Sequence, residues 1–369
     1  SMAPPGQVAT LILPADTAWN RTTAAPKPLP RIEPKAYSVD NVNDVARALK
    51  TDEPSVILMN GELTASRSAM ADQISQATGA RILMDTFVPR VHRGAGRAEV
   101  ARLPYFGEMA AEVLEGTKHL ILLSSQPPVT FFAYPDKPNY LTPEGCELHT
   151  LVERDEDIDG ALEALLDAVG GGDTSPRLVH LEIPDLPSGE LNQRSAGTTL
   201  AHLFPEDAII VDEGGMNGGG SVAATRTGKP HDHLILTGGA IGFGLPCATG
   251  AAVACPDRRV VSLQADGSAM YTNQALWTQA REQLNVTTII FANQKYGILQ
   301  VEFGRVGAHN PGPKAMSMLD LTNPEITWTD LAKGMGVPAS RVTTVDEYAK
   351  ALKASFATDG PALIEVMVP

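Results

Sequence analysis

The chain has 369 residues, of which 43 % are hydrophobic and 20 % charged, and its formal net charge is −14. This composition is typical of a globular protein with room for two domains, and the negative charge argues against nucleic acid or an anionic membrane as a partner. No apolar run approaches the roughly 18 residues of a membrane span. The three cysteines, Cys146, Cys247 and Cys255, indicate neither a disulfide framework nor a metal site and suit a reducing cytosol, so we expect a cytoplasmic protein.

The first 37 residues combine an apolar segment with a proline-rich one. The run from Gln7 to Leu13 predicts a buried strand, yet nothing before it offers a pairing partner. We therefore expect residues 1–20 to be the tail of a domain whose remainder is not in this chain. Residues 21–37 contain four prolines and predict a linker.

Helical and strand patterns alternate through residues 38–172. The patterns predict helices at 42–49, 66–78, 108–114 and 158–169, and strands at 55–59, 81–84 and 119–123. Strands that alternate with helices favour a parallel sheet with βαβ crossovers. We expect a central α/β domain over 38–172, closed by a glycine run, and a second linker over 173–195.

Residues 196–369 predict a second α/β domain. Its expected strands are 208–211, 234–236, 260–263, 288–291 and 362–368, and a helix is expected at 272–284. The fold class predicted for the chain is therefore α/β, with two doubly wound parallel-sheet domains.

A carboxylate and an amide follow two of these strands. Asp266 opens the sequence Asp266-Gly267-Ser268 after one strand, and Asn293 follows the next. The carboxyl edge of such a sheet is where ligands bind, and oxygen ligands suit a magnesium ion that carries a diphosphate. Both residues are also good helix N-caps, so the pair alone allows a purely structural interpretation.

Two glycine clusters flank this pair in the sequence. Residues 212–220 predict either a flexible loop or an anion-binding one, in which backbone N–H groups approach the ligand closely. The turn from Gly242 to Cys247 partly matches a dinucleotide fingerprint, and Asp266 lies 24 residues after Gly242. A nicotinamide-dependent dehydrogenase is thus an alternative, although Cys247 replaces the third glycine and no strand leads directly into Gly242.

As a set, these motifs resemble the thiamin diphosphate (ThDP) enzymes, and among them acetolactate synthase and benzoylformate decarboxylase. The resemblance rests on Asp266-Gly267-Ser268, on Asn293-x-Lys295, on 238–246 and on 256–261. It implies that Asp266, Asn293 and the backbone carbonyl of Lys295 bind Mg²⁺, and that Ser268 and the Gly267 amide bind the diphosphate. The other implied cofactor contacts are Glu213, Gly214, Gly215, Met216, Gly239, Ile241, Tyr296, Gly297 and Ile298.

The resemblance also implies an activity and an assembly. Ile241 would be the wedge that bends the cofactor, and Ile298 and Gln300 would help to shape the substrate pocket. The implied reaction is decarboxylation of a small-molecule 2-keto acid, with carboligation to a second carbonyl compound, by a homodimer or homotetramer. A glutamate that the reaction requires belongs to the N-terminal domain of such enzymes, so we expect this chain alone to fold but to be inactive.

Two positions depart from the family pattern and keep another alternative open. The family usually has glycine where this chain has Ala265, and asparagine where it has Ala292. A degenerate, non-catalytic ThDP-binding paralogue therefore remains a second interpretation.

Two polar stretches allow further readings. His231-Asp232-His233 predicts a solvated loop before a strand, in preference to a metal site, because no further ligand stands at a supporting spacing.

The central domain contains a short arginine-rich stretch, which we interpret as a solvated basic stretch in preference to a set of phosphate ligands. Its members are Arg90, Arg93 and Arg97. They surround Gly94-Ala95-Gly96, the one candidate nucleotide turn of the central domain, and we expect no tightly bound FAD.

Overall fold

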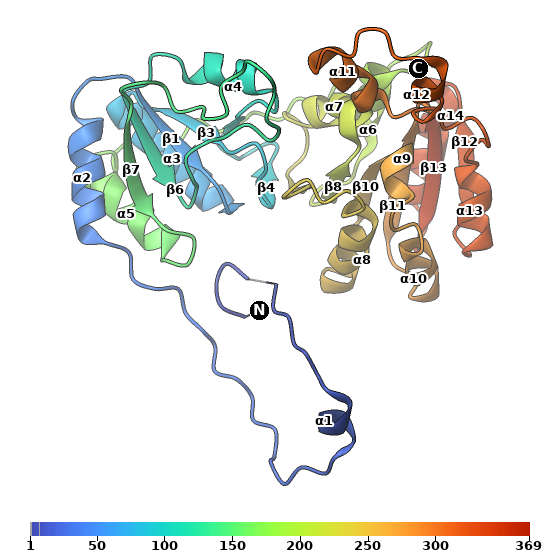
Figure 1. The fold of residues 1–369 in the computed structure, drawn as a ribbon, viewed down its shortest axis with the longest axis horizontal. Coiled ribbons are helices and arrows are strands. Elements are labelled where there is room, and N and C mark those ends of the chain that lie inside the picture. The colour runs from blue at the N-terminus through green and yellow to red at the C-terminus, as the bar shows by residue number, and fades with distance from the viewer. Residues whose placement is uncertain (1, 7) are drawn as a thin grey trace.

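The computed structural model describes residues 2–6 and 8–369. Two sheets flanked by helices make up its body (Figure 1). The first sheet has the order β5-β3-β1-β6-β7, and all of its pairs are parallel. Its strands are β1 (Ser55–Met59), β3 (Arg81–Met84), β5 (Ala101–Arg102), β6 (His119–Leu123) and β7 (Glu147–Val152).

Helices cover both faces of this first sheet. Ile57 and Met59 of β1 pack in one cluster with α2 (Val39–Leu49), α3 (Ala65–Thr78) and α5 (Ile158–Val169). Val56 and Leu58 pack in another with α4 (Gly107–Leu114). Successive side chains of a strand point to opposite faces. Because helices cover both faces, every residue of β1 is buried, and the strand is apolar from Val56 to Met59.

The second sheet has eight strands, in the order β12-β13-β11-β10-β8-β9-β4-β2. Its central strands are β8 (Ile209–Glu213), β10 (Val260–Ala265), β11 (Val286–Ala292) and β13 (Ala362–Met367), and β12 (Ala339–Val342) lies at one edge. Ile289 and Phe291 of β11 pack in a cluster with α6 (Gln193–Leu203) and α14 (Val345–Phe356). Ile290 packs with α8 (Gly244–Ala254), α10 (Ala275–Arg281) and α13 (Trp328–Gly334), so this sheet is also doubly wound.

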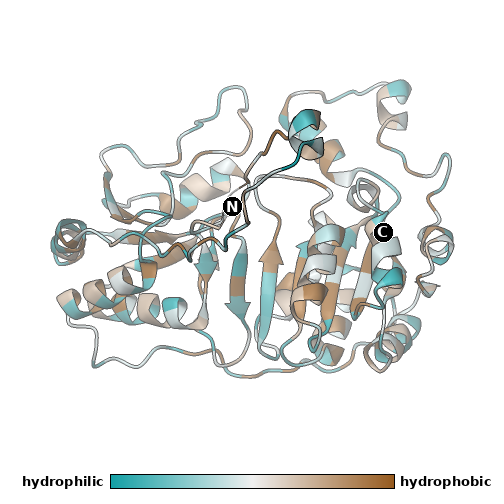
Figure 2. Cartoon of the chain, turned by 90° about the horizontal axis from the view of Figure 1, so that it is seen from below, coloured by the Kyte–Doolittle hydropathy of each residue, from teal (hydrophilic) through white to brown (hydrophobic). Residues whose placement is uncertain are grey.

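Two short strands from the first part of the chain extend the second sheet. β4 (Arg90–Arg93) pairs antiparallel with β9 (His231–Ile235), and β2 (Glu62–Leu63) pairs with β4. In Figure 2 this antiparallel pair lies in the middle of the molecule, with many hydrophilic residues. The α/β fold is confirmed, but the second sheet is mixed, and residues 62–63 and 90–93 of the expected central domain belong to it. The expected domain boundaries stay a prediction.

The expected strand at the N-terminus is wrong. Gln7 lies outside the described residues, and residues 8–13 form no strand, with Val8 99 % and Ile12 85 % exposed. A strand needs a neighbour to satisfy its backbone groups, and this segment runs away from both sheets through the short helix α1 (Ala15–Trp19) (Figure 1).

Over the described ranges, no helix combines the length and the hydropathy that crossing a bilayer would require.

Candidate cofactor-binding site

The ends of β10 and β11 bring Asp266 and Asn293 to one edge of the second sheet. The two strands are parallel neighbours in register, from Val260 opposite Val286 to Ala265 opposite Phe291. Asp266 follows β10 and Asn293 follows β11 directly. The register therefore places the expected carboxylate and amide beside each other, at the edge where open α/β sheets bind ligands.

The Asp266 carboxylate links the two strand ends. Oδ1 accepts a hydrogen bond from the Gly267 amide at 2.9 Å, and Oδ2 accepts one from the Gln294 amide at 2.7 Å. The side chain is almost fully buried, and this burial raises the pKa of Asp266 although the backbone amides oppose the shift. Among the described residues, only backbone N–H groups compensate this carboxylate, so a cation at this edge would offset the cost of burying its charge.

The loop after Asn293 is held in a strained conformation. Asn293 Oδ1 accepts from the Lys295 amide at 3.3 Å, and Gln294 has a left-handed backbone with φ 57°. The Tyr296 amide donates to Leu319 at 2.9 Å, and the Leu321 amide donates to Gln294 at 3.0 Å. Such strain in a residue other than glycine clusters at ligand sites, and here the antiparallel bridge between Lys295 and Asp320 maintains it.

The Asp266-Gly267-Ser268 segment begins the one-turn helix α9 (Asp266–Ala269), and its donors are already engaged. The Gly267 amide already donates to Asp266, and the Ser268 hydroxyl donates to the Ala265 carbonyl at 3.1 Å. A Cβ atom on Gly267 would overlap the ring of Tyr296, so the ring packs directly on this backbone. A diphosphate that uses these two donors must therefore replace hydrogen bonds that the turn makes to itself.

Glu213 acts on a turn and does not face open space. Its carboxylate is buried and accepts from the Gly242 amide at 2.5 Å and from the Gly244 amide at 2.6 Å. Burial raises the pKa of Glu213, and the two amides oppose that rise. Thr272 also donates to the Gly242 carbonyl, at 2.7 Å. Glu213 thus clamps the 238–244 turn to β8, and the direct cofactor contact expected of it stays a prediction.

The glycine-rich segment after Glu213 is a helix and not a loop. Helix α7 (Gly215–Ala224) begins there and packs against α6. A Cβ atom on Gly220 would overlap the backbone of Gln193, so glycine is required for this close approach of the two helices. The expectation of a loop is wrong for residues 215–220, which lie in α7, and helix packing explains Gly220. Diphosphate contacts by this segment stay a prediction.

The expected cofactor and pocket residues border an open apolar surface. Met216 on α7 is 50 % exposed, Ile241 on the clamped turn 53 %, and Ile298 on α11 (Gly297–Arg305) 36 %. Gln300 also lies on α11. Phe131, which the sequence gave no reason to select, packs against Gly239 on the same turn.

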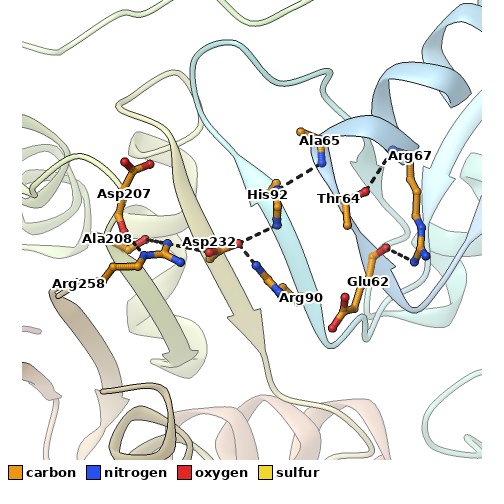
Figure 3. Close-up of polar contacts among 10 residues, drawn as sticks. All are labelled: Glu62, Thr64, Ala65, Arg67, Arg90, His92, Asp207, Ala208, Asp232 and Arg258. Atoms are coloured by element: carbon orange, nitrogen blue, oxygen red, sulfur yellow. Dashed lines mark hydrogen bonds and ion pairs between the residues drawn. The ribbon is translucent and has the colours of Figure 1, made fainter. Parts of the chain in front are cut away.

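The expectation for His231-Asp232-His233 is wrong. These residues begin β9 and are buried rather than solvated. Asp232 Oδ1 accepts from Arg90 Nε at 3.1 Å, Oδ2 pairs with Arg258 Nη2 at 2.7 Å, and His92 Nε2 lies 3.1 Å from Oδ1 (Figure 3). Burial opposes ionisation of Asp232, but the hydrogen bonds from both arginines hold its pKa below the ordinary value.

Arg90 and Arg93 make structural contacts, whereas the side chain of Arg97 donates an exposed hydrogen bond to the Gly96 carbonyl, at 3.3 Å. Arg93 donates to the Val222 carbonyl at 3.2 Å and lies 3.0 Å from His233 Nδ1, and burial lowers its pKa to about 10. Gly94-Ala95-Gly96 does follow a strand, β4, but the Ala95 amide donates to the Gly228 carbonyl at 2.9 Å. Arg90 and Arg93 are therefore not a solvated basic stretch, and the turn contacts protein backbone.

Known proteins share this arrangement. Residues 218–366 match the thiamine pyrophosphate enzyme family, C-terminal TPP-binding domain. A Mycobacterium tuberculosis protein, IlvX, named for acetolactate synthase large subunits, is 49 % identical over 365 residues, which cover 98 % of this chain and 70 % of that protein. The chain belongs to the thiamin diphosphate-dependent enzymes. This membership speaks against the nicotinamide interpretation of the 242–247 turn.

Other ThDP enzymes match more distantly. Benzoylformate decarboxylase of Pseudomonas aeruginosa is 34 % identical over 216 residues, 57 % of this chain and 39 % of that enzyme. The chain thus spans less than half the length of that relative. The structure of a ThDP-dependent 4-hydroxybenzoylformate decarboxylase from Rhodococcus jostii RHA1 has a TM-score of 0.71 and 24 % identity, over 96 % of this chain and 68 % of that one, which supports the fold.

Proposed function

We propose that this chain binds the diphosphate of ThDP through Mg²⁺ and serves decarboxylation of a 2-keto acid, with carboligation as in acetolactate synthases. The proposed metal ligands are Asp266, Asn293 and the carbonyl of Lys295. The observation that carries the proposal is the buried Asp266 carboxylate, which joins two strand ends and has no side-chain cation beside it in the described part of the chain. A hard divalent ion with oxygen ligands suits that position.

The roles of the remaining residues follow from their contacts. ThDP, when bound, supplies the electron sink for loss of CO₂. Glu213 holds the turn that carries Ile241 by two backbone hydrogen bonds. This clamp would fix the branched side chain as a support of defined shape for the cofactor, because a wedge requires position rather than chemistry. Ile298 and Gln300 on α11 would border the substrate.

The open apolar surface supports assembly with a second subunit. Met216, Ile241, Tyr271 and Ile298 are each at least 36 % exposed although they surround one site. Apolar residues gathered at a binding edge mark an interaction surface. We propose that a homodimer or homotetramer covers this edge and excludes water from the reaction.

The two departures from the family pattern weigh little against catalysis. Ala265 has an extended backbone, with φ −86° and ψ 147°, that alanine adopts without strain. Ala292 is buried at the end of β11, where its methyl group places no polar atom in the core. Neither substitution disturbs the strand ends that carry Asp266 and Asn293, so the catalytic interpretation is preferred to a degenerate paralogue.

Isothermal titration calorimetry with ThDP tests the proposal. Wild type should bind ThDP with MgCl₂ present and lose binding in EDTA. Asp266→Asn should lose the magnesium-dependent binding, since it removes the anionic ligand, whereas Asp330→Asn, an exposed acid on α13, should retain it. Equal ThDP affinity in wild type and Asp266→Asn would contradict the assignment of the metal site.

A further inference from the structure

Three potential metal ligands meet at the amino end of the first sheet, away from Asp266. His119 is the first residue of β6, and Glu147 and His149 belong to the edge strand β7. The parallel register places His119 opposite Glu147. Side chains two positions apart share a face of a strand, so Glu147 and His149 both lie on the face that His119 occupies.

The donor atoms of these residues converge. His119 Nδ1 lies 3.1 Å from His149 Nε2, and Glu147 Oε2 lies 3.7 Å from the first nitrogen and 3.8 Å from the second. A tetrahedral zinc ion with Zn–N bonds of about 2.0–2.1 Å holds neighbouring donors about 3.3 Å apart. The three atoms thus approximate one face of a coordination tetrahedron, and shifts of a few tenths of an ångström would complete it.

A fourth residue sets the tautomer of His119. Glu53, in the turn before β1, places Oε2 at 3.0 Å from His119 Nε2. A carboxylate accepts hydrogen bonds, so this contact assigns the proton to Nε2 and leaves the lone pair of Nδ1 toward the cluster. Metal-binding histidines have this arrangement, in which a carboxylate holds the other ring nitrogen and fixes the ring.

Hydrogen bonding alone accounts for only part of the cluster. A shared proton explains the contact between the two imidazoles. It does not explain Glu147, whose oxygen is beyond hydrogen-bond distance of both rings yet almost equally far from each. A cation between the three donors explains all three distances. The Glu147 side chain is 71 % exposed, so an ion can enter from solvent.

We propose that His119, Glu147 and His149 bind a zinc ion, with water as the fourth ligand and Glu53 as a positioning residue for His119. Two imidazoles and a carboxylate select zinc over magnesium, which prefers oxygen ligands. The ion would tie the edge strand β7 to β6 and, through Glu53, to the turn before β1. This site is independent of the proposed ThDP chemistry.

Titration with Co²⁺, a spectroscopic substitute for Zn²⁺, tests the site. Wild type should develop the intense visible d–d bands of a four-coordinate ion, and one equivalent of Zn²⁺ should abolish them, whereas Mg²⁺ should not. Glu147→Gln and His149→Gln should lose these bands. His309→Gln, which removes an exposed imidazole from another part of the chain, should keep them. Far-UV circular dichroism of the metal-free proteins checks that each variant folds.

The positioning role of Glu53 has its own readout. Glu53→Gln should retain the d–d spectrum but weaken Zn²⁺ affinity on the order of 10- to 100-fold, because loss of the outer partner loosens the ring without removing a ligand. Unchanged bands in both Glu147→Gln and His149→Gln would overturn the proposal. A thiolate-to-cobalt charge-transfer band would also overturn it, since it would assign the ion to a cysteine.

Discussion

Arg305 of α11 forms a two-point salt bridge with Glu108 of α4, with Nη1–Oε1 at 2.6 Å and Nη2–Oε2 at 2.9 Å. The guanidinium carbon also lies 4.3 Å from the ring centroid of Phe106 and 4.6 Å from that of Tyr134. Helix α11 carries Ile298 and Gln300 and has no buried residue of its own. The orientation of α11 therefore depends on its contact with α4 and the neighbouring aromatic rings of the first sheet's layer.

Replacing Arg305 should loosen α11. Arg305→Met keeps an aliphatic stem but removes the salt bridge and the cation–π contacts, which together contribute about 1–2 kcal/mol at a partly exposed site. Hydrogen exchange of residues 297–305 should accelerate, and urea unfolding should shift to lower concentration. Lys137→Met is the matched control, since Lys137 contacts Glu108 through a single atom at 3.2 Å. Equal exchange rates in the two variants would contradict this role of Arg305.

The same salt bridge makes stability depend on acid. The hydrogen bond from Arg305 lowers the pKa of Glu108 from 4.5 to about 2. A carboxylate with a lowered pKa contributes stability that is present above its unfolded-state pKa and is lost as pH falls through the folded-state value. Wild type should therefore unfold at higher urea than Glu108→Gln above pH 4.5, and the gap should close as the pH falls toward 2. A gap that does not change with pH would exclude the carboxylate charge as its source.

Glu213 should be necessary for the conformation of the turn that carries Ile241. Glu213→Gln replaces one of two accepting oxygens by an NH₂ group, which cannot accept the hydrogen bond of Gly242 or Gly244. An unsatisfied buried amide costs about 1–3 kcal/mol, so we expect lower stability and weaker ThDP binding. Urea unfolding and calorimetry measure the two effects. Glu206→Gln, an exposed position, should change neither, and wild-type ThDP affinity in Glu213→Gln would show that the clamp is dispensable.

Removing the charge of Asp232 should be among the most damaging changes in the second sheet. Asp232→Asn leaves Arg90 and Arg258 without their carboxylate partner in a buried strand. The side chains of Arg90 and Arg258 are 36 % and 27 % exposed, so their unpaired charges stay partly solvated and we expect a loss of about 1–3 kcal/mol. The free energy of unfolding, from urea titration, checks this. Asp257→Asn, exposed and next to Arg258, should remain within about 0.5 kcal/mol of wild type.

Hydrophobic patterns within single segments predicted several strands and one helix correctly. The bounds are as expected for β1, β3, β6 and α5. Apolar runs mark the strands buried in the sheet, and helical periodicity marks α5. The placement of Asp266 and Asn293 also followed, since both are adjacent to strands that are neighbours in the chain.

Contacts between distant segments could not be predicted in this way. His231 and Asp232 are polar and indicated a loop, yet pairing of β9 with β4 places them inside a sheet, where Arg90 and Arg258 compensate the charge. The clamp by Glu213 and the packing of Phe131 on Gly239 likewise join segments far apart in the sequence. No periodicity within one segment carries that information.

The antiparallel pairing of β4 with β9 limits how this chain can be exchanged with its relatives. A chimera that took residues 38–172 from another family member would import a new β4 beside the original β9. Asp232 would then meet whatever side chains stood in place of Arg90 and His92. A graft that preserves these ion pairs therefore has to transfer β4 and β9 together.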